Sequence, residues 1–519
     1  MTPRTLEQLF QDQPDIRLPD SARRMHVRRV RDDSRQVEQG DVFVAVRGAA
    51  ADGTGHITEA VERGAAAIVI EAGGEDPPAL EALAGAGVPI VRVPNARNAL
   101  AELAAAFFDY PARRVRMVGI TGTVGKTSVL AMLAEILAAA AIRAGTMGSL
   151  GIRFPGGGAD SPNTTPGALT VQESLSDMAA AGVSVAAMEV TSHALVQERI
   201  RGLRYDLGVF TNLTMLEHLE YHGSFRNYAA AKLRFLDTLA PKAPLCYAAG
   251  DRVVRQAARQ HPGPRISCGG GGAWVLVRRE PLSLSGTRIS LTIRRPLPRL
   301  DGSCLEPCTV PVQLQTLGRP NTANATLAAA AGLIAGAPPE AVREGLARIA
   351  PPKRRLEVIY DRGPIVIDDT VGHPDSITGV FEVAESVQHR ELRVVFCIRG
   401  RRGPDINARD AEAVAIWSRR VHIHRLHVTS AEDTADDRNT VSRDERRAFL
   451  DTLEGNAVEH EHHPRLEDAI TAALSGSADE DVVLLLGAQG MDAGAAIARA
   501  MLDDAGSPLD AAGEGRTTR

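Results

Sequence analysis

The sequence predicts an α/β protein with three domains: a central P-loop mononucleotide-binding domain, a smaller N-terminal α/β domain and a C-terminal Rossmann-like domain. Three observations lead to this prediction. Short apolar strands alternate with helical segments along nearly the whole chain. A glycine-rich loop, "GITGTVGKTS", stands between an apolar strand and a long helix. The length of 519 residues corresponds to about three domains of roughly 150 residues each.

The N-terminal domain is predicted to cover residues 1–111. It contains three apolar strands and then a helix that stops before Pro111, because a proline interrupts the helical hydrogen bonds. The strands are expected at 41–48, 65–71 and 88–93, and the helix at 96–110.

The central domain is predicted at 112–350 and the C-terminal domain at 351–505, with the double proline Pro351–Pro352 at their boundary. A flexible tail is expected over 506–519. The strands of the central domain are expected at 115–121, 185–190 and 207–213, with an alternating β-rich segment at 273–293. Those of the C-terminal domain are expected at 364–369, 392–398, 425–430 and 481–487, each before a helical stretch, as in a doubly wound sheet.

The composition predicts neither a nucleic-acid-binding protein nor a membrane protein. The net charge is −5 and the chain has no long basic run. The apolar segment at 129–142 is too short to span a membrane and contains Glu135, and the N-terminus lacks the apolar core of a signal peptide. Five cysteines, an odd number, are typical of a reducing compartment, and we expect Cys304 and Cys308 to be free thiols. We therefore expect a cytoplasmic monomer.

The loop after the strand at 115–121 predicts a phosphate-binding site. Its glycines allow successive backbone N–H groups, and the positive end of the following helix, to face an anion. Lys126 is placed to neutralise phosphate oxygens, and the hydroxyl of Thr127 to hold a magnesium ion. The alternative is a tight strand-to-helix turn without a ligand. The residues expected to contact the nucleotide are Gly122, Thr123, Gly125, Lys126, Thr127 and Ser128.

The segment "GITGTVGKT" resembles the phosphate loop of the Mur ligases, which make amide bonds in peptidoglycan precursors, with Val124 where that family usually has asparagine. Other segments resemble motifs of this family, in the same order: "DSRQVEQGDVFVAVRG", "NTTPGALTVQESL", "MEVTSHALVQERI", "TNLTMLEHLEYHGSFRNYAAAKLRF", "LGRPNTANATLAAAA" and "RRLEVI". The resemblance runs from about Asp33 to about Gly490 and is nearest to the MurE branch, which adds the third residue of the stem peptide. It implies ATP-dependent ligation of an amino acid to a UDP-linked muramoyl peptide through an acyl phosphate, with ATP and Mg²⁺ as cofactors.

The resemblance also implies catalytic residues that bind metal. Glu189, at the end of an apolar strand, would hold Mg²⁺ together with Thr127, and His218 matches a metal-binding histidine of the family. Lys232 falls on the family's carbamylated lysine, whose carbamate would hold a second Mg²⁺; a solvated helix lysine is the alternative. The catalytic residues implied are Lys126, Glu189, His218 and Lys232, and the metal ligands Thr127, Glu189, His218 and Lys232.

Further positions are implied to contact the nucleotide and the sugar peptide. Asn321 resembles the residue that contacts adenine, although a helix N-cap is an alternative. Arg355 and Asp369 resemble groups that reach ATP from the third domain. The resemblance implies that the N-terminal domain binds the UDP part of the other substrate. The contacts to the UDP-muramoyl peptide fall on Ser34, Asn163, Thr164, Thr165, Thr191, Gln197 and Arg199.

The resemblance is weakest in the third domain, where the family binds the incoming amino acid. In "DTVGHPD" Gly372 replaces a histidine, "GAQGMD" replaces Gly-Lys-Gly-His-Glu, and "TSAEDTADDRN" lacks the Asp-Asn-Pro-Arg stretch that recognises diaminopimelate. A buried charged group needs a partner, so these departures favour a different amine. Three interpretations stay open: a peptidoglycan ligase, a Mur-like ligase that amidates another carboxylate in specialised metabolism, and a non-catalytic nucleotide-binding scaffold.

Two histidine-rich tracts, "HIHRLH" and "HEHHPRLED", lie in the third domain. Neither matches the ligand spacing of a known kind of metal site. They are therefore predicted to be titrating surface histidines.

Overall fold

The computed structural model describes residues 4–48, 52–73, 87–214, 219–280, 286–350, 353–437 and 439–505. It divides into two compact units, one of Met1–Val277, Leu291–Val310 and Ala323–Leu346, the other of Arg278–Ser290, Pro311–Thr322 and Ala347–Arg519. Both units are α/β, which confirms the predicted class, whereas the three domain boundaries stay predictions. The boundary prolines Pro351 and Pro352 and the tail at 506–519 lie outside the described residues.

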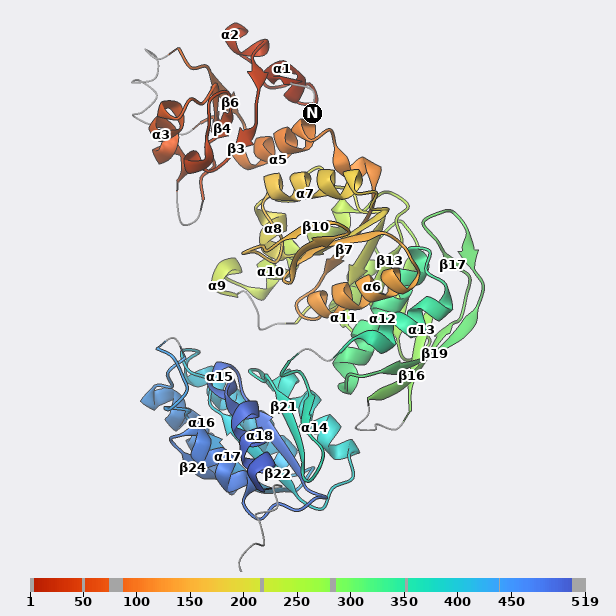
Figure 1. Cartoon of the computed structure of the whole chain (residues 1–519), viewed down its shortest axis with the longest axis vertical. Coiled ribbons are helices and arrows are strands. Elements are labelled where there is room, and N and C mark those ends of the chain that lie inside the picture. The colour runs from red at the N-terminus through yellow and green to blue at the C-terminus, as the bar shows by residue number, and fades with distance from the viewer. Residues whose placement is uncertain are drawn as a thin grey trace, which may run out of the picture. The chain divides into compact units, whose positions relative to one another are not determined.

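A four-stranded parallel sheet forms the N-terminal part of the first unit (Figure 1). Helix α5 (Ala96–Phe107) begins after Asn95, whose side chain accepts a hydrogen bond from the Asn98 N–H at 2.9 Å. The apolar face of α5 packs on the sheet, so the strands and the helix expected here are confirmed. The strands are β3 (Val30–Arg31), β4 (Val42–Val44), β5 (Ala67–Glu71) and β6 (Ile90–Val93); smaller elements are β1 (Arg4–Thr5), α1 (Leu6–Leu9), α2 (Asp20–Arg23), β2 (His26–Val27) and α3 (Ile57–Glu62).

The largest sheet has eleven strands and positions the candidate site. Its central strand β7 (Arg116–Thr121) is buried over Met117–Thr121 and lies parallel to β11 and β12 on its two sides. The strand order is β10 (Gly157–Ala159), β9 (Gly151–Phe154), β8 (Ala144–Gly148), β11 (Val185–Val190), β7, β12 (Leu207–Phe210), β13 (Leu245–Ala248), β14 (Arg265–Gly269), β15 (Val275–Arg279), β16 (Thr287–Ile293) and β19 (Cys308–Leu314).

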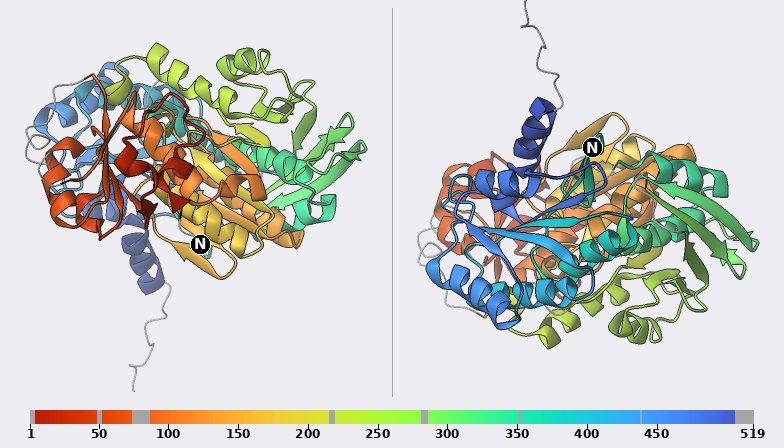
Figure 2. Two further views of the ribbon diagram at one scale, coloured as in Figure 1. Left: turned by 90° about the horizontal axis from the view of Figure 1, so that it is seen from above. Right: turned by 90° about the horizontal axis from the view of Figure 1, so that it is seen from below.

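Helix α6 (Lys126–Ala139) follows β7 and packs against β7, β8 and β11 (Figures 1 and 2). Its buried face is formed by Val129, Leu130, Met132, Leu133, Ile136 and Leu137. The expected strand, loop and helix are therefore all present. The other helices of this region are α7 (Ala168–Ala180), α8 (Ser192–Val196), α9 (Leu219–His222), α10 (Phe225–Leu233), α11 (Arg252–Ala258), α12 (Gly318–Ile334) and α13 (Pro339–Arg348), and β17 (Leu297–Pro298) pairs with β18 (Cys304–Leu305).

A six-stranded sheet organises the second unit. Its inner strands are buried and mostly apolar, as expected for a parallel sheet covered on both faces, with Arg393 in β22 as a charged exception. The order is β20 (Glu357–Tyr360), β21 (Ile365–Asp369), β25 (Val482–Leu486), β22 (Leu392–Cys397), β23 (Ile423–Thr429) and β24 (Glu461–His463), with only β20 antiparallel to its neighbour. The helices are α14 (Pro374–Ser386), α15 (Pro404–Ser418), α16 (Arg443–Gly455), α17 (Leu466–Leu474) and α18 (Gly494–Ala505).

None of the five cysteines forms a disulfide; Cys304 is exposed and Cys308 half-buried, and their being free thiols stays a prediction. Within the described ranges, no helix combines the length and the apolar character needed to cross a membrane.

Candidate active site

The phosphate loop connects the carboxyl end of β7 to the first turn of α6. Gly122 has φ +145°, and a Cβ added there would lie 1.9 Å from Oγ1 of Thr211, so the position requires glycine. Gly125 has φ +88° and precedes the first helical residue. Glycine has no side chain that could cap the helix, so the positive end of α6 faces the loop.

The tip of the loop is fixed by the segment that follows β12. Asn212 accepts from the Val124 N–H at 3.0 Å and donates its amide to the Val124 carbonyl at 3.0 Å. The Thr211 hydroxyl donates to the same carbonyl at 2.6 Å. These contacts hold the backbone of Val124, whose side chain is 41% exposed, so valine is accommodated where the resemblance leads one to expect asparagine.

Lys126 lies across the inside of the loop. Its Nζ donates to the carbonyl oxygens of Gly122 and Thr123, each at 2.9 Å. The side chain is half-buried, and its ammonium group is therefore held over the residues that would surround a phosphate.

Glu189 and Thr127 bring together a carboxylate and a hydroxyl beside the phosphate loop. Glu189 is fully buried; its Oε2 accepts from the Thr127 hydroxyl at 2.9 Å and its Oε1 from the Ser149 N–H at 2.8 Å. Burial raises the pKa of Glu189, and the hydrogen bonds from Ser149 and Thr127 oppose this rise. A carboxylate and a hydroxyl are hard ligands, so these residues fit the Mg²⁺ that a phosphate loop implies.

Lys232 reaches the same loop from α10. Its side chain is only 1% exposed, and its Nζ donates to the Gly122 carbonyl at 2.9 Å, the same oxygen that Lys126 contacts. The Nζ also lies 5.2 Å from the ring centre of Tyr228, whose hydroxyl is 2.9 Å from Oγ1 of Thr123. Lys232 therefore contacts the loop from a buried position on α10 and is not a solvated helix residue. His218, the fourth expected catalytic residue, lies outside the described residues.

A group of rings beside the site was not predicted from the sequence. His193 and Tyr221 lie with ring centres 4.1 Å apart, and Tyr221 and His222 with ring centres 4.9 Å apart. The Nε2 of His222 is 3.0 Å from the Ser192 hydroxyl. The three rings lie in the motifs "EVTSHAL" and "EYHG", in which the sequence analysis predicted only neighbouring residues to belong to the site.

The expected sugar-peptide contacts fall into three places. Thr165 is buried; its hydroxyl donates to the Glu189 carbonyl at 2.9 Å and lies 3.1 Å from that of Thr191. Arg199 donates to the Thr165 carbonyl at 2.7 Å and to Oε1 of Gln197 at 2.6 Å. This cluster joins Thr165, Thr191, Gln197 and Arg199, and it is linked to the Glu189 backbone through Thr165.

The other three expected contacts are separate from that cluster. The Thr164 hydroxyl lies 3.0 Å from the Ser149 hydroxyl, and Asn163 is exposed in the same loop. Ser34, in the N-terminal sheet region, is buried and donates its hydroxyl to Oε2 of Glu59 at 2.6 Å. Ser34 is thus engaged within the protein in this conformation.

The residues expected to reach the nucleotide from the second unit have internal partners. Asn321 lies in the first turn of α12, where its amide donates to the Leu317 carbonyl at 2.8 Å; it is not the N-cap residue. Arg355 donates to the Thr370 carbonyl at 3.0 Å. Asp369 accepts from the Leu356 N–H at 2.7 Å, and burial raises its pKa to about 7.

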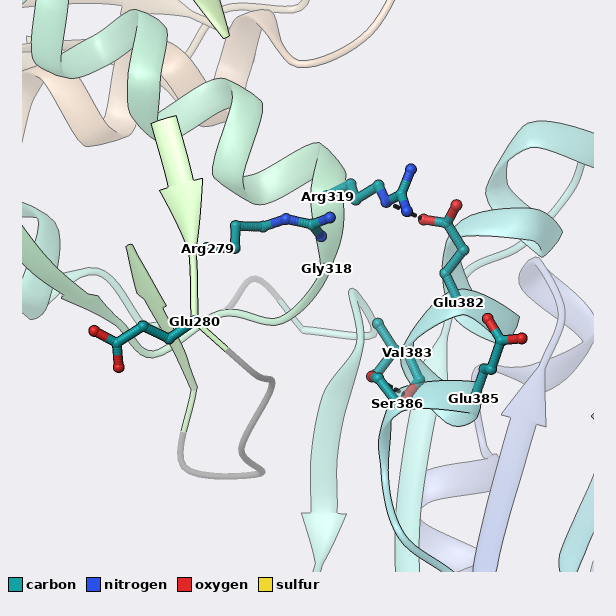
Figure 3. Close-up of a pocket in the computed structure, with 8 residues that line it drawn as sticks. All are labelled: Arg279, Glu280, Gly318, Arg319, Glu382, Val383, Glu385 and Ser386. Carbon is teal, nitrogen blue, oxygen red and sulfur yellow. Dashed lines mark hydrogen bonds and ion pairs between the residues drawn. The ribbon is translucent and has the colours of Figure 1, made fainter. Parts of the chain in front are cut away.

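A hollow of about 390 Å³ lies at the start of α12 (Figure 3). Arg319 and Glu382 point toward one another across it, with Nε and Oε2 2.9 Å apart, and Arg279 lies beside Arg319. Burial and the charge of Arg319 lower the pKa of Arg279. The hollow therefore presents two guanidinium groups near the turn that carries Asn321.

A glycine-rich phosphate loop, a buried carboxylate–threonine pair and a buried lysine on a parallel sheet define a nucleotide-binding α/β enzyme. Comparison with protein families gives the more specific class. Residues 26–108 match the "Mur ligase family, catalytic domain", residues 120–332 the "Mur ligase middle domain" and residues 354–489 the "Mur ligase, glutamate ligase domain". The chain belongs to the Mur ligase family.

Its curated relatives include UDP-N-acetylmuramoyl-L-alanyl-D-glutamate–2,6-diaminopimelate ligases. The protein from Alkalilimnicola ehrlichii is 33% identical over 475 residues, covering 88% of each chain, and that from Pseudomonas aeruginosa is 31% identical over 490 residues, covering 93% of each. A solved structure of a ligase of this name has a TM-score of 0.67 at 21% identity and covers 94% of each chain. The predicted family, MurE-like branch and ligase class are confirmed.

Proposed function

We propose that this protein joins an amino acid to the terminal carboxylate of UDP-N-acetylmuramoyl-L-alanyl-D-glutamate at the expense of ATP. The observation that carries the proposal is the arrangement of Lys126, Lys232, Thr127 and Glu189 around one phosphate loop. ATP, Mg²⁺, the UDP-linked peptide and an amino acid are the proposed ligands, and we propose the cytoplasm as the location and a monomer as the active form.

The chemistry requires positioning and charge neutralisation more than a protein nucleophile. The substrate carboxylate attacks the terminal phosphorus of ATP and ADP leaves; the amine then attacks the acyl carbon, loses a proton and displaces phosphate. Both steps bring anions together, so Lys126 and the N–H groups at the start of α6 are proposed to hold phosphate oxygens. Thr127 and Glu189 are proposed to hold Mg²⁺, with His218 as a further ligand.

Lys232 is proposed to be carbamylated and to bind a second Mg²⁺. The support is its burial and the carbonyl it shares with Lys126. Carbamylation joins the neutral amine of a lysine to CO₂ and so requires that Lys232 loses its proton. The carbamate would replace a cation with an anion beside the loop.

The remaining contacts are proposed in two groups. The Thr165 and Arg199 cluster and the nearby "NTT" loop are proposed to bind the muramoyl peptide, with Ser34 on the uridine side. The full proposed sets are Gly122, Thr123, Gly125, Lys126, Thr127, Ser128, Asn321, Arg355 and Asp369 for ATP, and Ser34, Asn163, Thr164, Thr165, Thr191, Gln197 and Arg199 for the UDP-linked substrate.

The test is phosphate release and product mass with UDP-muramoyl dipeptide, Mg-ATP and a panel of amino acids. We expect phosphate release to require both carboxylate and amine. Lys126→Ala should lower turnover by about a hundredfold or more, the scale of a lost electrostatic contact to a transition state. The exposed Lys242→Ala is the matched control. Turnover close to wild type in Lys126→Ala would disprove the site, and turnover with a carboxylate other than the UDP-linked peptide would show a different substrate.

A further inference from the structure

We propose that the C-terminal sheet binds a transition-metal ion of the Zn²⁺ type through His427 of β23 and Glu461 and His463 of β24. The three residues come from the two histidine tracts that were predicted to be surface residues. That prediction is wrong for His427, which is 3% exposed. None of the three residues belongs to the proposed ligase site.

Parallel pairing of β23 and β24 brings the two tracts together. His427 lies opposite Glu461, and His463 is two residues further along β24 and therefore on the same face of the strand. The Nδ1 of His427 is 3.1 Å from the Nε2 of His463, and the Oε2 of Glu461 is 3.7 Å from each of these nitrogens. The tracts lack a recognisable spacing because a sheet register, not a local motif, creates the cluster.

The size of this triangle fits a metal ion. Zn²⁺ lies about 2.0–2.2 Å from nitrogen and oxygen ligands in a tetrahedron, so its ligand atoms are about 3.3–3.5 Å apart. The three observed separations lie within a few tenths of an ångström of this range. Two imidazoles and one carboxylate leave a fourth position for water, as in open zinc sites.

Burial and charge also suit a cation. His463 is 14% and Glu461 68% exposed, so the buried His427 ring forms the floor of the cluster and Glu461 its open side. Arg393 and Arg425 face His427 and oppose a cation, whereas Glu461 adds the compensating negative charge.

Metal binding would fasten the edge of the sheet. Strand β24 has three residues and pairs only with β23 in the sheet order, so a ligand set that spans both strands would hold it in place. Because the ion binds the folded arrangement and not the unfolded chain, Zn²⁺ should raise the melting temperature of the metal-free protein.

The test uses the full chain, freed of metal by dialysis against a chelator and titrated with Zn²⁺ in the absence of nucleotide. We expect one Zn²⁺ to bind at this site. When Co²⁺ is added in place of Zn²⁺, the site should show the intense visible absorption of tetrahedral Co²⁺. His463→Gln and Glu461→Gln should weaken Zn²⁺ binding, the histidine change by more than about tenfold, as ligand-shell changes do. The matched control is His462→Gln, which changes the neighbouring residue of β24, whose Nε2 lies 3.0 Å from the Ser430 hydroxyl.

The outcomes are distinct. Loss of the site in His463→Gln with retention in His462→Gln supports the proposal. Three results would overturn it: no Zn²⁺ binding to the wild type, equal binding by His463→Gln, or equal weakening by both histidine variants. The rings of His427 and His463 would then form only a hydrogen bond. His427→Gln changes a buried side chain, so circular dichroism must show that this variant folds. If it does not fold, the variants of the more exposed His463 and Glu461 still test the proposal.

Discussion

At the scale of single residues, the site is defined by polar groups buried against one another. Lys232 and Glu189 are buried, and an unpaired buried charge is costly, so each must be compensated within the site. Glu189 has the Thr127 hydroxyl and the Ser149 N–H, while Lys232 shares the Gly122 carbonyl with Lys126. Such an arrangement suits residues whose main partners are a metal ion and a nucleotide.

The first prediction concerns Lys232. Lys232→Ala should lose most of the ligase activity, because it removes the proposed carbamate that holds the second Mg²⁺. Added formate or acetate should restore part of the activity by supplying a carboxylate in the space left by the side chain. The measurement is phosphate release with and without the small acid, with Lys242→Ala as control. Full activity without any added acid would show that Lys232 has no such role.

The second prediction concerns Asp410, a buried residue of α15. Burial raises its pKa to about 7, so the folded protein keeps a proton that the unfolded chain releases from about pH 4. Stability should therefore fall as the pH rises from about 4 to about 7. Asp368 and Asp369, with pKa values of about 6 and about 7, titrate in the same window, so the comparison must be between variants.

Asp410→Asn carries no charge and should therefore be more stable than the wild type at pH 8, by on the order of 1–3 kcal/mol. The difference should shrink toward pH 4, where the wild-type carboxyl is protonated in the fold. Urea unfolding at several pH values measures it, and the exposed Glu412→Gln on the same helix is the control. A gain that is equal at pH 4 and pH 8 would exclude titration of Asp410 as the cause.

At the scale of elements, the ends of β7, β8 and β11 position the proposed catalytic groups. Gly148, the last residue of β8, lies directly against Glu189: an added Cβ would be 2.3 Å from Oε1 of Glu189 and 2.7 Å from a methyl carbon of Leu130. The last residue of β8 must therefore lack a side chain, so that the Glu189 carboxylate can reach Thr127.

The third prediction follows from this contact. Gly148→Ala should displace the Glu189 carboxylate and lower kcat by about tenfold or more, since misplacement of about 1 Å can cost up to about a hundredfold. A Mg²⁺ titration should show weakened metal dependence, and excess Mg²⁺ should recover part of the rate. Gly250→Ala, where an added Cβ has open space, is the control. Unchanged kcat and Mg²⁺ dependence would mean that Glu189 does not hold the metal.

The elements themselves were largely predictable, because buried parallel strands are apolar runs and helices follow them. The loop at Gly122–Lys126 was predictable for the same local reason. The ring group of His193, Tyr221 and His222 was not, since it depends on two segments that meet only in the fold. The cluster of His427 and His463 escaped prediction because the register of β23 and β24 creates it. Local signals predict elements; contacts between distant segments need the structure.

At the scale of the whole molecule, the departures from the family's motifs lie in the C-terminal unit. In that unit, Arg399 donates to the Gly372 carbonyl at 2.9 Å, and a Cβ added at Gly372 would lie 2.4 Å from the same Nη1. The glycine that replaces the expected histidine is therefore coupled to this arginine. Asp433, in the segment without Asp-Asn-Pro-Arg, accepts from the Leu466 N–H at 2.7 Å and so is engaged at the start of α17.

The last prediction is that the amine is not held as diaminopimelate is held in the MurE branch, although the curated relatives carry that name. Diaminopimelate has a distal ammonium and carboxylate, and a selective pocket must pair both charges. Arg399 donates to the Gly372 carbonyl and its charge acts on the buried Asp410, and Asp433 is committed to α17, so neither residue is arranged as the diaminopimelate contact of the relatives. We therefore expect simpler or acidic amino acids to compete well.

A competition assay with equal concentrations of diaminopimelate, lysine and small or acidic amino acids measures this selectivity by product mass. Arg399→Ala should reduce use of the preferred amino acid more than it reduces ATP binding, because the guanidinium is expected to contact the substrate and not the nucleotide. Arg419→Ala, an exposed arginine at the end of α15, is the control. A dedicated polar pocket rejects an unmatched substrate by large factors. Preference for diaminopimelate by about a hundredfold or more would therefore show that this unit builds such a pocket from residues other than those of its relatives.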